Sequence, residues 1–368
     1  MTRWRGIGRR QAIAVLALGG TAILLCLWVA AALPSVVAGG ATASASDGDL
    51  ALYRRIIQHM RDGATYYSAA HEQLVNSGYG TQSVFNWRLP TLLWLLSKLP
   101  SLEVGQAVLM GLAVAAGTVM GRVLYREGGW RLAAPGSVVM MLSLAGAFVP
   151  GTVLLSEFPA GLLIFLSVGF YGLGHRRAGL AAGASALLVR ELAGIYVLVC
   201  IWLAWRAKRW GELAGWGAVL LAYGAYFVWH YGQVQLHLEA SDPGYAEGWI
   251  QFGGLRFVLA TAAFNGFFVA LPFVVYAALV PVALLGLRAW PGEAGARAGL
   301  TVLAAIIVFA IVGKPVNDYW GLIYTPLLSL GLAWAPVAIA DLVRGAIGGA
   351  TRWSSWSRPT LDPGDPRA

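Results

Sequence analysis

Long stretches without a charged side chain constrain this chain more than any other feature of its sequence. Asp, Glu, Lys and Arg make up only 12% of its 368 residues, against about a quarter in a typical soluble domain. No charged residue occurs in 11–46, 104–121, 132–156, 158–175, 213–238, 257–287, 298–313 or 319–340. A helix needs about 20 apolar residues to cross a bilayer, and backbone groups cannot stay unpaired in lipid. The pattern predicts an all-α, polytopic transmembrane helical bundle.

The charge-free stretches predict about ten membrane segments. We expect them at about 11–33, 102–124, 132–150, 153–173, 178–205 (two short segments), 211–231, 264–287, 298–313 and 320–341. A long outer loop is expected at 34–101 and a second one at 232–262, so a single membrane domain would cover 1–341. The last part of 342–368 is rich in Ser, Pro and charge, which predicts a disordered cytoplasmic tail.

The stretch 178–205 allows two interpretations. Basic residues flank it at 176–177 and at 206–209, which is typical of cytoplasmic ends, but it is too short for two full crossings. The charged pair Arg190-Glu191 divides it into two uncharged halves. A short hairpin with a polar tip fits these facts. The alternative is one tilted span with a buried ion pair, which would invert all later topology. The alternation of basic residues after 205 favours the hairpin.

The distribution of charge predicts the orientation. With a cytoplasmic N-terminus, most of the 26 Lys and Arg residues fall in cytoplasmic segments, and this positive-inside pattern accounts for the net charge of +9 without nucleic acid. We therefore expect a multi-pass protein of the inner or plasma membrane with both termini in the cytoplasm. Most acidic residues then lie outside, so we expect any active site on the outer face. No HExxH, GxSxG, P-loop or GxGxxG motif occurs.

The first outer loop contains an amphipathic pattern over 49–62. Its apolar residues recur with the spacing of one helical face, and polar residues fill the other face. The apolar face consists of Leu52, Tyr53, Ile56, Ile57 and Met60, and the polar face of Arg54, Arg55, Gln58, His59 and Arg61. The pattern predicts a helix that lies flat on the membrane surface and ends at Gly63.

Asp49, at the start of this helix, has two interpretations. Ser46-x-x-Asp49 resembles a capping box, and a carboxylate in the first turn interacts favourably with the helix dipole. The same carboxylate is a candidate general base. The local pattern alone leaves both open.

Further charged residues stand near the ends of the expected spans. Arg88, before Leu89-Pro90, is either an interfacial anchor or a phosphate ligand. Glu157 lies at an outer turn among apolar neighbours, either as an ordinary loop carboxylate or as a functional group. Lys314 and Asp318 form a similar polar tip.

The order of these residues resembles the GT-C superfamily, membrane glycosyltransferases that use lipid-phosphate-linked sugars. Members commonly have an Asp four residues before an aromatic residue on a surface helix, as Asp49 precedes Tyr53. A Gly-x-x-Tyr element follows, here 63–66, and then a basic-x-Pro element, here Arg88-Leu89-Pro90.

Two further features extend the resemblance over about 11–340. An acidic residue at an outer turn precedes an apolar span, here Glu157, and a cytoplasmic hairpin carries a basic tip, with Arg190 where many members have Lys. The chain departs from the family in two places. Leu50 follows Asp49 where an acidic residue is common, which leaves open whether Asp47 substitutes for that residue and whether Asp47 or Asp49 is the base, and Glu157 replaces a frequent Asp.

The resemblance implies an inverting transfer of a sugar from a polyprenyl-phosphate donor to an envelope glycan or lipid acceptor. Asp49 would deprotonate the acceptor hydroxyl. Arg88 and Arg190 would neutralise the departing phosphate, and Glu157 would orient the acceptor or hold a divalent cation (Mg or Mn). The implied catalytic residues are Asp49 and Glu157, and the implied substrate-binding residues are Asp47, Tyr53, Arg88, Arg190, Glu191, Lys314 and Asp318.

Two other classes of function fit a polytopic chain. A transporter or lipid flippase needs a continuous polar path across the bilayer, whereas the charges here gather at the outer ends of the spans. A non-catalytic scaffold for envelope assembly would tolerate changes in the outer carboxylates. Loss of function in Asp49→Asn would separate a transferase from a scaffold.

Overall fold

The computed structural model describes residues 2–32, 45–244 and 251–348, and the side chains of 45–47 are not described. Within these ranges every regular element is a helix, as expected. The α-helices are α1 (Arg9–Ala32), α3 (Ala45–Arg61), α4 (Tyr66–Asn76), α5 (Pro90–Lys98), α6 (Leu102–Gly128), α7 (Trp130–Ser143), α8 (Glu157–Gly172), α9 (Arg176–Val189), α10 (Gly194–Arg206), α11 (Trp210–His237), α12 (Gly254–Ala262), α13 (Phe273–Ala289), α14 (Gly292–Ile311) and α15 (Thr325–Ile347). The 3-10 segments are η1 (Val84–Asn86), η2 (Ala145–Phe148), η3 (Thr152–Leu154), η4 (Glu191–Ala193) and η5 (Pro315–Ile323).

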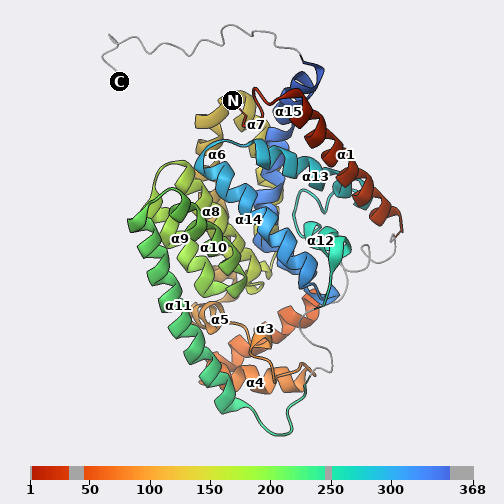
Figure 1. Cartoon of the computed structure of the whole chain (residues 1–368). Coiled ribbons are helices and arrows are strands. Elements are labelled where there is room, and N and C mark those ends of the chain that lie inside the picture. The colour runs from red at the N-terminus through yellow and green to blue at the C-terminus, as the bar shows by residue number, and fades with distance from the viewer. Residues whose placement is uncertain (1, 33–44, 245–250, 349–368) are drawn as a thin grey trace.

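The molecule has two distinct ends (Figure 1). Helix α1 begins and α15 finishes at one end, where Arg9 Nε donates to the carbonyl of Ala346 at 3.1 Å. We call this the terminal end. Helices α3, α4 and α5 lie together at the opposite end, which we call the loop end. Helices α3, α4 and α5 therefore form a small helical layer at the end of the molecule opposite the start of α1.

Four described helices are long and apolar enough to cross a membrane: α1, α6, α14 and α15. Helices α8 and α13 are apolar but shorter. These helices support the expected membrane protein. The total of about ten segments and the side on which each end lies stay predictions.

The stretch 178–205 forms two helices, α9 and α10, with Arg190 between them. Arg176 at the start of α9 and Arg209 beyond the end of α10 both pair with the same Oε1 of Glu293, at 3.1 and 2.6 Å. Both ends of the stretch therefore lie at the same end of the bundle, which is the hairpin arrangement and not a single tilted span.

Several expected boundaries differ from the structure. Helix α7 ends at Ser143, inside the segment expected at 132–150. Helix α13 begins only at Phe273, because Asn265 accepts from the backbone N–H groups of Phe267 and Phe268 and Pro272 precedes the helix. The second outer loop expected at 232–262 contains the end of α11 and all of α12. Helix α15 continues past residue 341, and the tail at 349–368 lies outside the described residues.

The amphipathic helix of the first loop is present as α3, and Gly63 follows it with a φ of 104°. Its apolar residues Leu52, Tyr53, Ile56 and Ile57 are all buried. They pack inside the protein, because α3 contacts α4 and α5. The expectation that this face rests on the lipid surface is therefore wrong, since neighbouring helices cover it.

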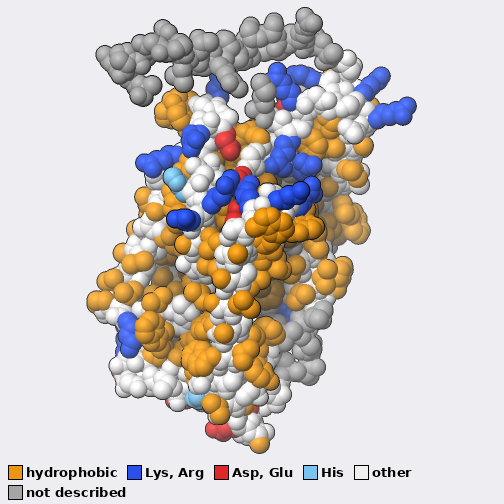
Figure 2. Space-filling view, turned by 60° about the vertical axis from the view of Figure 1, so that its left-hand side comes forward, with side chains coloured by type: hydrophobic (Ala, Val, Ile, Leu, Met, Phe, Trp, Pro, Cys, Tyr) orange, Lys and Arg blue, Asp and Glu red, His pale blue; other side chains and the backbone are white. Residues whose placement is uncertain are grey.

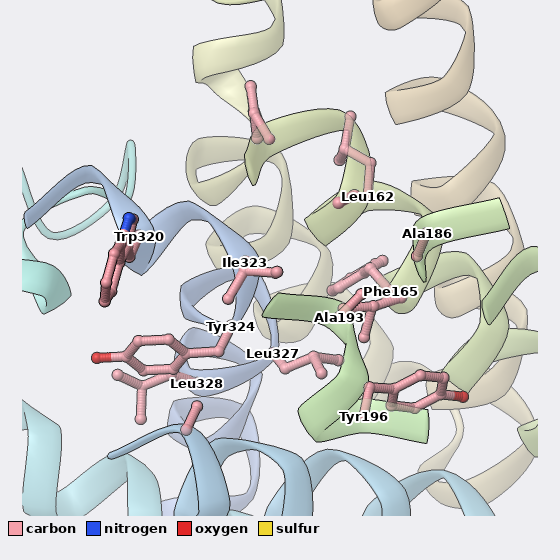
Figure 3. Packing of buried hydrophobic residues seen from close by; sticks show 14 of the residues in the cluster. Leu162, Phe165, Ala186, Ala193, Tyr196, Trp320, Ile323, Tyr324, Leu327 and Leu328 are labelled. Atoms are coloured by element: carbon pink, nitrogen blue, oxygen red, sulfur yellow. The ribbon is translucent and has the colours of Figure 1, made fainter. Parts of the chain in front are cut away.

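Two glycines let the backbone of η5 approach its neighbours closely. A Cβ on Gly161 of α8 would overlap the carbonyl oxygen of Leu322, and one on Gly321 would overlap that of Thr261 in α12. Figure 3 shows the resulting packing, with Ile323 and Leu327 facing Leu162 and Phe165 of α8. This close approach holds η5 beside the start of α8.

We expect Gly161→Ala to lower the stability of the protein by roughly 1–3 kcal/mol, because its Cβ meets backbone and not a flexible side chain. The matched control is Gly224→Ala in α11, where nothing lies within 4 Å of the added Cβ. That change should leave stability equal or slightly higher. Thermal unfolding of both purified variants checks this, and equal melting temperatures would contradict the packing argument.

Candidate functional site

A buried ion pair connects the start of α8 to the tip of the hairpin. Glu157 is 1% exposed and the Arg190 side chain 3% exposed, and Arg190 Nε lies 2.8 Å from Glu157 Oε1. The two atoms are not aligned as a hydrogen bond. Ser156 Oγ donates to the other carboxylate oxygen at 3.3 Å, and Arg190 Nη1 also pairs with Glu191. The polar tip of the hairpin thus reaches the acidic turn that the sequence singled out.

Arg88 joins this pair from the first loop. Its Nη1 lies 3.6 Å from Glu157 Oε1, so one carboxylate serves two guanidinium groups. Arg88 Nε donates to the phenol oxygen of Tyr53 at 2.7 Å, and Nη2 donates to that of Tyr319 at 2.5 Å. Its backbone is fixed as well, because Tyr66 Oη donates to the Arg88 carbonyl at 2.5 Å. The anchor interpretation of Arg88 does not fit this position, since a membrane-surface anchor keeps its charge exposed.

Asp49 lies one helical turn before Tyr53 on α3 and is half-buried. Tyr79 Oη donates to its Oδ1 at 2.6 Å, and its charge acts on the phenols of both Tyr53 and Tyr319. Helix α3 begins at Ala45, so Asp49 lies beyond the first turn. The capping interpretation is therefore disfavoured, and the carboxylate acts electrostatically on the two phenols that accept from Arg88.

The two tyrosines supply hydrogen-bond donors as well as packing. Burial raises the pKa of Tyr53 to about 12, so its phenol stays protonated at neutral pH. Tyr53 and Tyr319 each accept a bond from Arg88 and keep an O–H to donate. The site thus presents guanidinium and phenol groups together with one accessible carboxylate.

The residues of the site do not suit a divalent cation. Glu157 is shared by Arg88 and Arg190, so its charge is already compensated. Among the described residues, no three His, Cys, Asp or Glu side chains are grouped as a metal site would need. We therefore derive no step through Mg or Mn.

The remaining predicted residues lie in different positions. The Asp47 side chain is outside the described part of the chain. Glu191 is at the site and 20% exposed. Lys314 precedes η5 and is partly buried, while Asp318 is buried within η5 and its charge acts on Tyr276 of α13.

Three participants were missed from the sequence. The sequence indicated Asp318 because of its charge, and it did not indicate the adjacent Tyr319. Tyr79 and Ser156 contact Asp49 and Glu157 respectively. Of these three residues, only Ser156 could have been predicted from the sequence, because it is adjacent to Glu157.

No family model, curated protein or solved structure gave a match to the chain. The chemistry of the site itself therefore has to carry the functional proposal.

Glu157→Gln should destabilise the protein by about 3–5 kcal/mol, because it leaves two buried guanidinium groups without their shared carboxylate. The control is Glu72→Gln, in which the carboxylate is 54% exposed and its partner His59 is 36% exposed, and which should cost less than about 1 kcal/mol. Unfolding followed by tryptophan fluorescence measures both. Similar losses of stability in the two variants would contradict the argument that two arginines depend on Glu157.

The stability of the protein should also depend on pH through Asp318. Burial raises the pKa of this carboxyl to about 7, whereas an unfolded aspartate titrates near 3.9. Between about pH 4 and pH 7 the folded state holds the extra proton, so stability falls as pH rises, by at most about 1.4 kcal/mol per pH unit. Above pH 7 the loss is complete and stability no longer changes.

Asp318→Asn should remove this slope and make the protein more stable than wild type at pH 8. Melting temperatures between pH 5 and pH 8 measure it, with the exposed Asp62→Asn as a control that keeps the slope. The same slope in Asp318→Asn and wild type would refute the assignment.

Proposed function

We propose that this chain is a membrane glycosyltransferase that moves a sugar from a polyprenyl-phosphate-linked donor to an envelope glycan or lipid acceptor. The observation that carries the proposal is the convergence of Arg88 and Arg190 on Glu157, next to two phenols on which the charge of Asp49 also acts. Two guanidinium groups suit a phosphate, and an accessible carboxylate suits the removal of a hydroxyl proton.

The arginines support the phosphate end of the reaction. Glu157 is almost fully buried and contacts both guanidinium groups, so it holds them in place before any substrate arrives. Such preorganised charge stabilises a departing phosphate without reorganisation during the reaction. Glu191 is more exposed and pairs with Arg190 Nη1, so in our proposal it moves aside and a phosphate oxygen takes its place.

Asp49 supports the acceptor end. In the proposed step the acceptor hydroxyl oxygen attacks the anomeric carbon of the donor sugar, and the bond from that carbon to the phosphate oxygen breaks. The hydroxyl proton passes to the Asp49 carboxylate, and the bond electrons leave with the polyprenyl phosphate. A single in-line displacement inverts the anomeric configuration. Tyr79 holds Oδ1, which leaves Oδ2 to take the proton.

The position of the site fits a lipid-linked donor. The first loop and the tip of the hairpin meet away from the terminal end, near the loop end of the bundle (Figure 1). If the basic terminal end is cytoplasmic, as the positive-inside pattern predicts, the site opens toward the outer face of the inner or plasma membrane. A polyprenyl phosphate presents its phosphate near the surface of a bilayer, where this site would receive it.

Asp49→Asn should reduce transfer by about 10²–10⁴-fold while the protein still inserts and folds, because the base is lost and the volume is kept. Membranes that contain the protein are incubated with a panel of polyprenyl-phosphate sugars and acceptors, and released polyprenyl phosphate is quantified by mass spectrometry. This product is common to every donor sugar. The control is Asp62→Asn, an exposed carboxylate just beyond α3 that accepts from Gln58, which should keep full activity.

Full activity in Asp49→Asn would refute the assignment of the base. Release of no polyprenyl phosphate by the wild-type protein with any donor, together with unchanged envelope glycans in deletion cells, would favour the scaffold or transporter alternatives.

A further inference from the structure

A cavity of about 800 Å³ lies at the terminal end, between α10, α13 and α14. Its charged lining consists of Arg3, Arg206, Arg209, Arg288, Arg297 and Glu293. Five arginines thus face one glutamate. In Figure 2, many Lys and Arg side chains gather toward the terminal end of the molecule. The residues of the proposed sugar-transfer site do not line this cavity.

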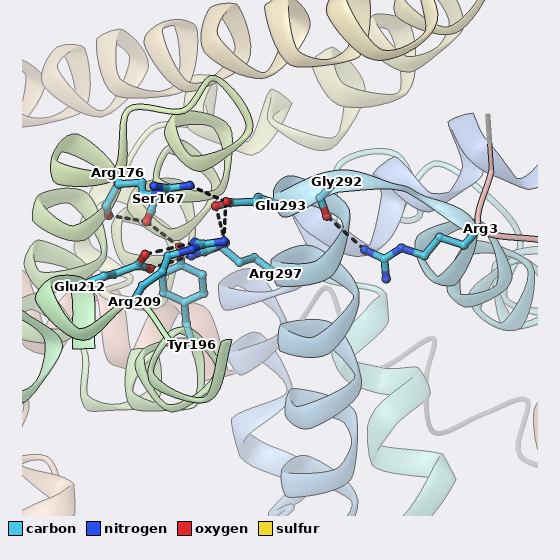
Figure 4. A network of polar contacts seen from close by, with 10 residues as sticks. Arg3, Ser167, Arg176, Tyr196, Arg209, Glu212, Gly292, Glu293 and Arg297 are labelled. Atoms are coloured by element: carbon cyan, nitrogen blue, oxygen red, sulfur yellow. Dashed lines mark hydrogen bonds and ion pairs between the residues drawn. The ribbon is translucent and has the colours of Figure 1, made fainter. Parts of the chain in front are cut away.

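Two of the five arginines are neutralised within the protein. Arg297 is 1% exposed and pairs with Glu212 at 2.8 Å and with Glu293 at 3.1 Å. Arg209 pairs with the same two carboxylates at 3.2 and 2.6 Å. Figure 4 shows this network, which forms one wall of the cavity. Arg209 and Arg297 therefore each have two carboxylate partners and serve the structure.

The other three arginines are different. Arg3, Arg206 and Arg288 are exposed, and they take part in none of the ion pairs formed by the described residues. Arg3 Nη2 donates to the carbonyl of Gly292 at 3.1 Å, while Arg206 and Arg288 lie over the rings of Trp202 and Trp4.

The positive charges of this group also repel one another. Burial lowers the pKa of Arg3, and the charge of Arg288 lowers it further. The Glu127 carboxylate acts in the opposite direction and raises the pKa of Arg3. Arg206 and Arg288 are held by the rings of Trp202 and Trp4, and their charges are available to an anion.

The rest of the cavity is apolar. Leu284 and Leu287 of α13 and Leu300 and Leu303 of α14 also line it. Along α14 the lining runs from Gly292 to Leu303, a rise of about 16 Å. A free inorganic anion occupies only a few ångströms of such a channel. The length and the leucine lining suit a hydrocarbon chain attached to the anion.

From these observations we infer that the cavity binds an anionic phospholipid. The phosphate headgroup lies among Arg3, Arg206 and Arg288, and an acyl chain extends between α13 and α14. The apolar lining favours this lipid over a free anion. The positive charge of the arginines favours it over a zwitterionic lipid. Basic pockets between membrane helices are a known physical basis for such recognition. The inference does not depend on the proposed sugar transfer.

The test uses the full chain in detergent and native mass spectrometry. Dioleoyl phosphatidylglycerol and dioleoyl phosphatidylcholine, which share the same acyl chains, are titrated separately, and inorganic phosphate is added as a competitor. Wild type should bind phosphatidylglycerol more tightly than phosphatidylcholine, and millimolar phosphate should not displace it. The double variant Arg206→Gln/Arg288→Gln should weaken phosphatidylglycerol binding by about 25-fold, or about fivefold per arginine.

Two controls separate the pocket from general surface charge. Arg10→Gln/Arg177→Gln removes two exposed arginines that do not line the cavity and should leave binding unchanged. Leu300→Trp narrows the apolar part and should weaken binding although every charge is kept. Equal binding of the two lipids, an equal loss in the Arg10/Arg177 variant, or full displacement by phosphate with no effect of Leu300→Trp would each overturn the inference.

Discussion

The arrangement of the site depends on one buried carboxylate shared by two arginines. A charge as deeply buried as that of Glu157 is costly unless other charges and hydrogen bonds compensate it, and here Arg88 and Arg190 both lie against the same oxygen. These residues come from the first loop, the start of α8 and the tip of the hairpin. Compensation of this one carboxylate therefore fixes three segments relative to one another. A fourth segment, η5, is held to them by the hydrogen bond from Arg88 to Tyr319.

The hairpin can deliver Arg190 to this place because its base is held as firmly as its tip. Arg176 and Arg209 at the base contact Glu293, which in turn pairs with the buried Arg297. Helices α9 and α10 have 14 and 13 residues, a rise of about 20 Å each, which is less than the roughly 30 Å core of a bilayer. If the base lies at one membrane surface, the tip ends about 10 Å short of the other surface. Polar partners from α8 and the first loop must then surround the charged tip.

The sequence predicted those parts of the structure that depend on local patterns. The apolar face of α3, its end near Gly63, the hairpin and the candidates Glu157 and Arg190 follow from periodicity or from the placement of charges among apolar segments. Arg88 became a site candidate only through the resemblance to a known family. The sequence did not predict that α4 and α5 cover the apolar face of α3. The same apolar pattern is expected whether lipid or protein covers that face. Tyr319 and Tyr79 likewise become part of the site only through contacts between distant segments. The late start of α13 depends on the side-chain hydrogen bonds of Asn265, which periodicity does not reveal.

The different environments of the two central carboxylates assign them different roles. Glu157 is almost fully buried and faces two cations, so its ionised form is held in place and it is a poor proton acceptor. Asp49 is half-buried, and its described hydrogen bond comes from the neutral phenol of Tyr79. It keeps one oxygen for a substrate. Carboxylates that share a site divide their tasks according to such surroundings. In the reaction we propose, Glu157 is therefore a positioning residue for Arg88 and Arg190, and Asp49 is the group that takes the proton.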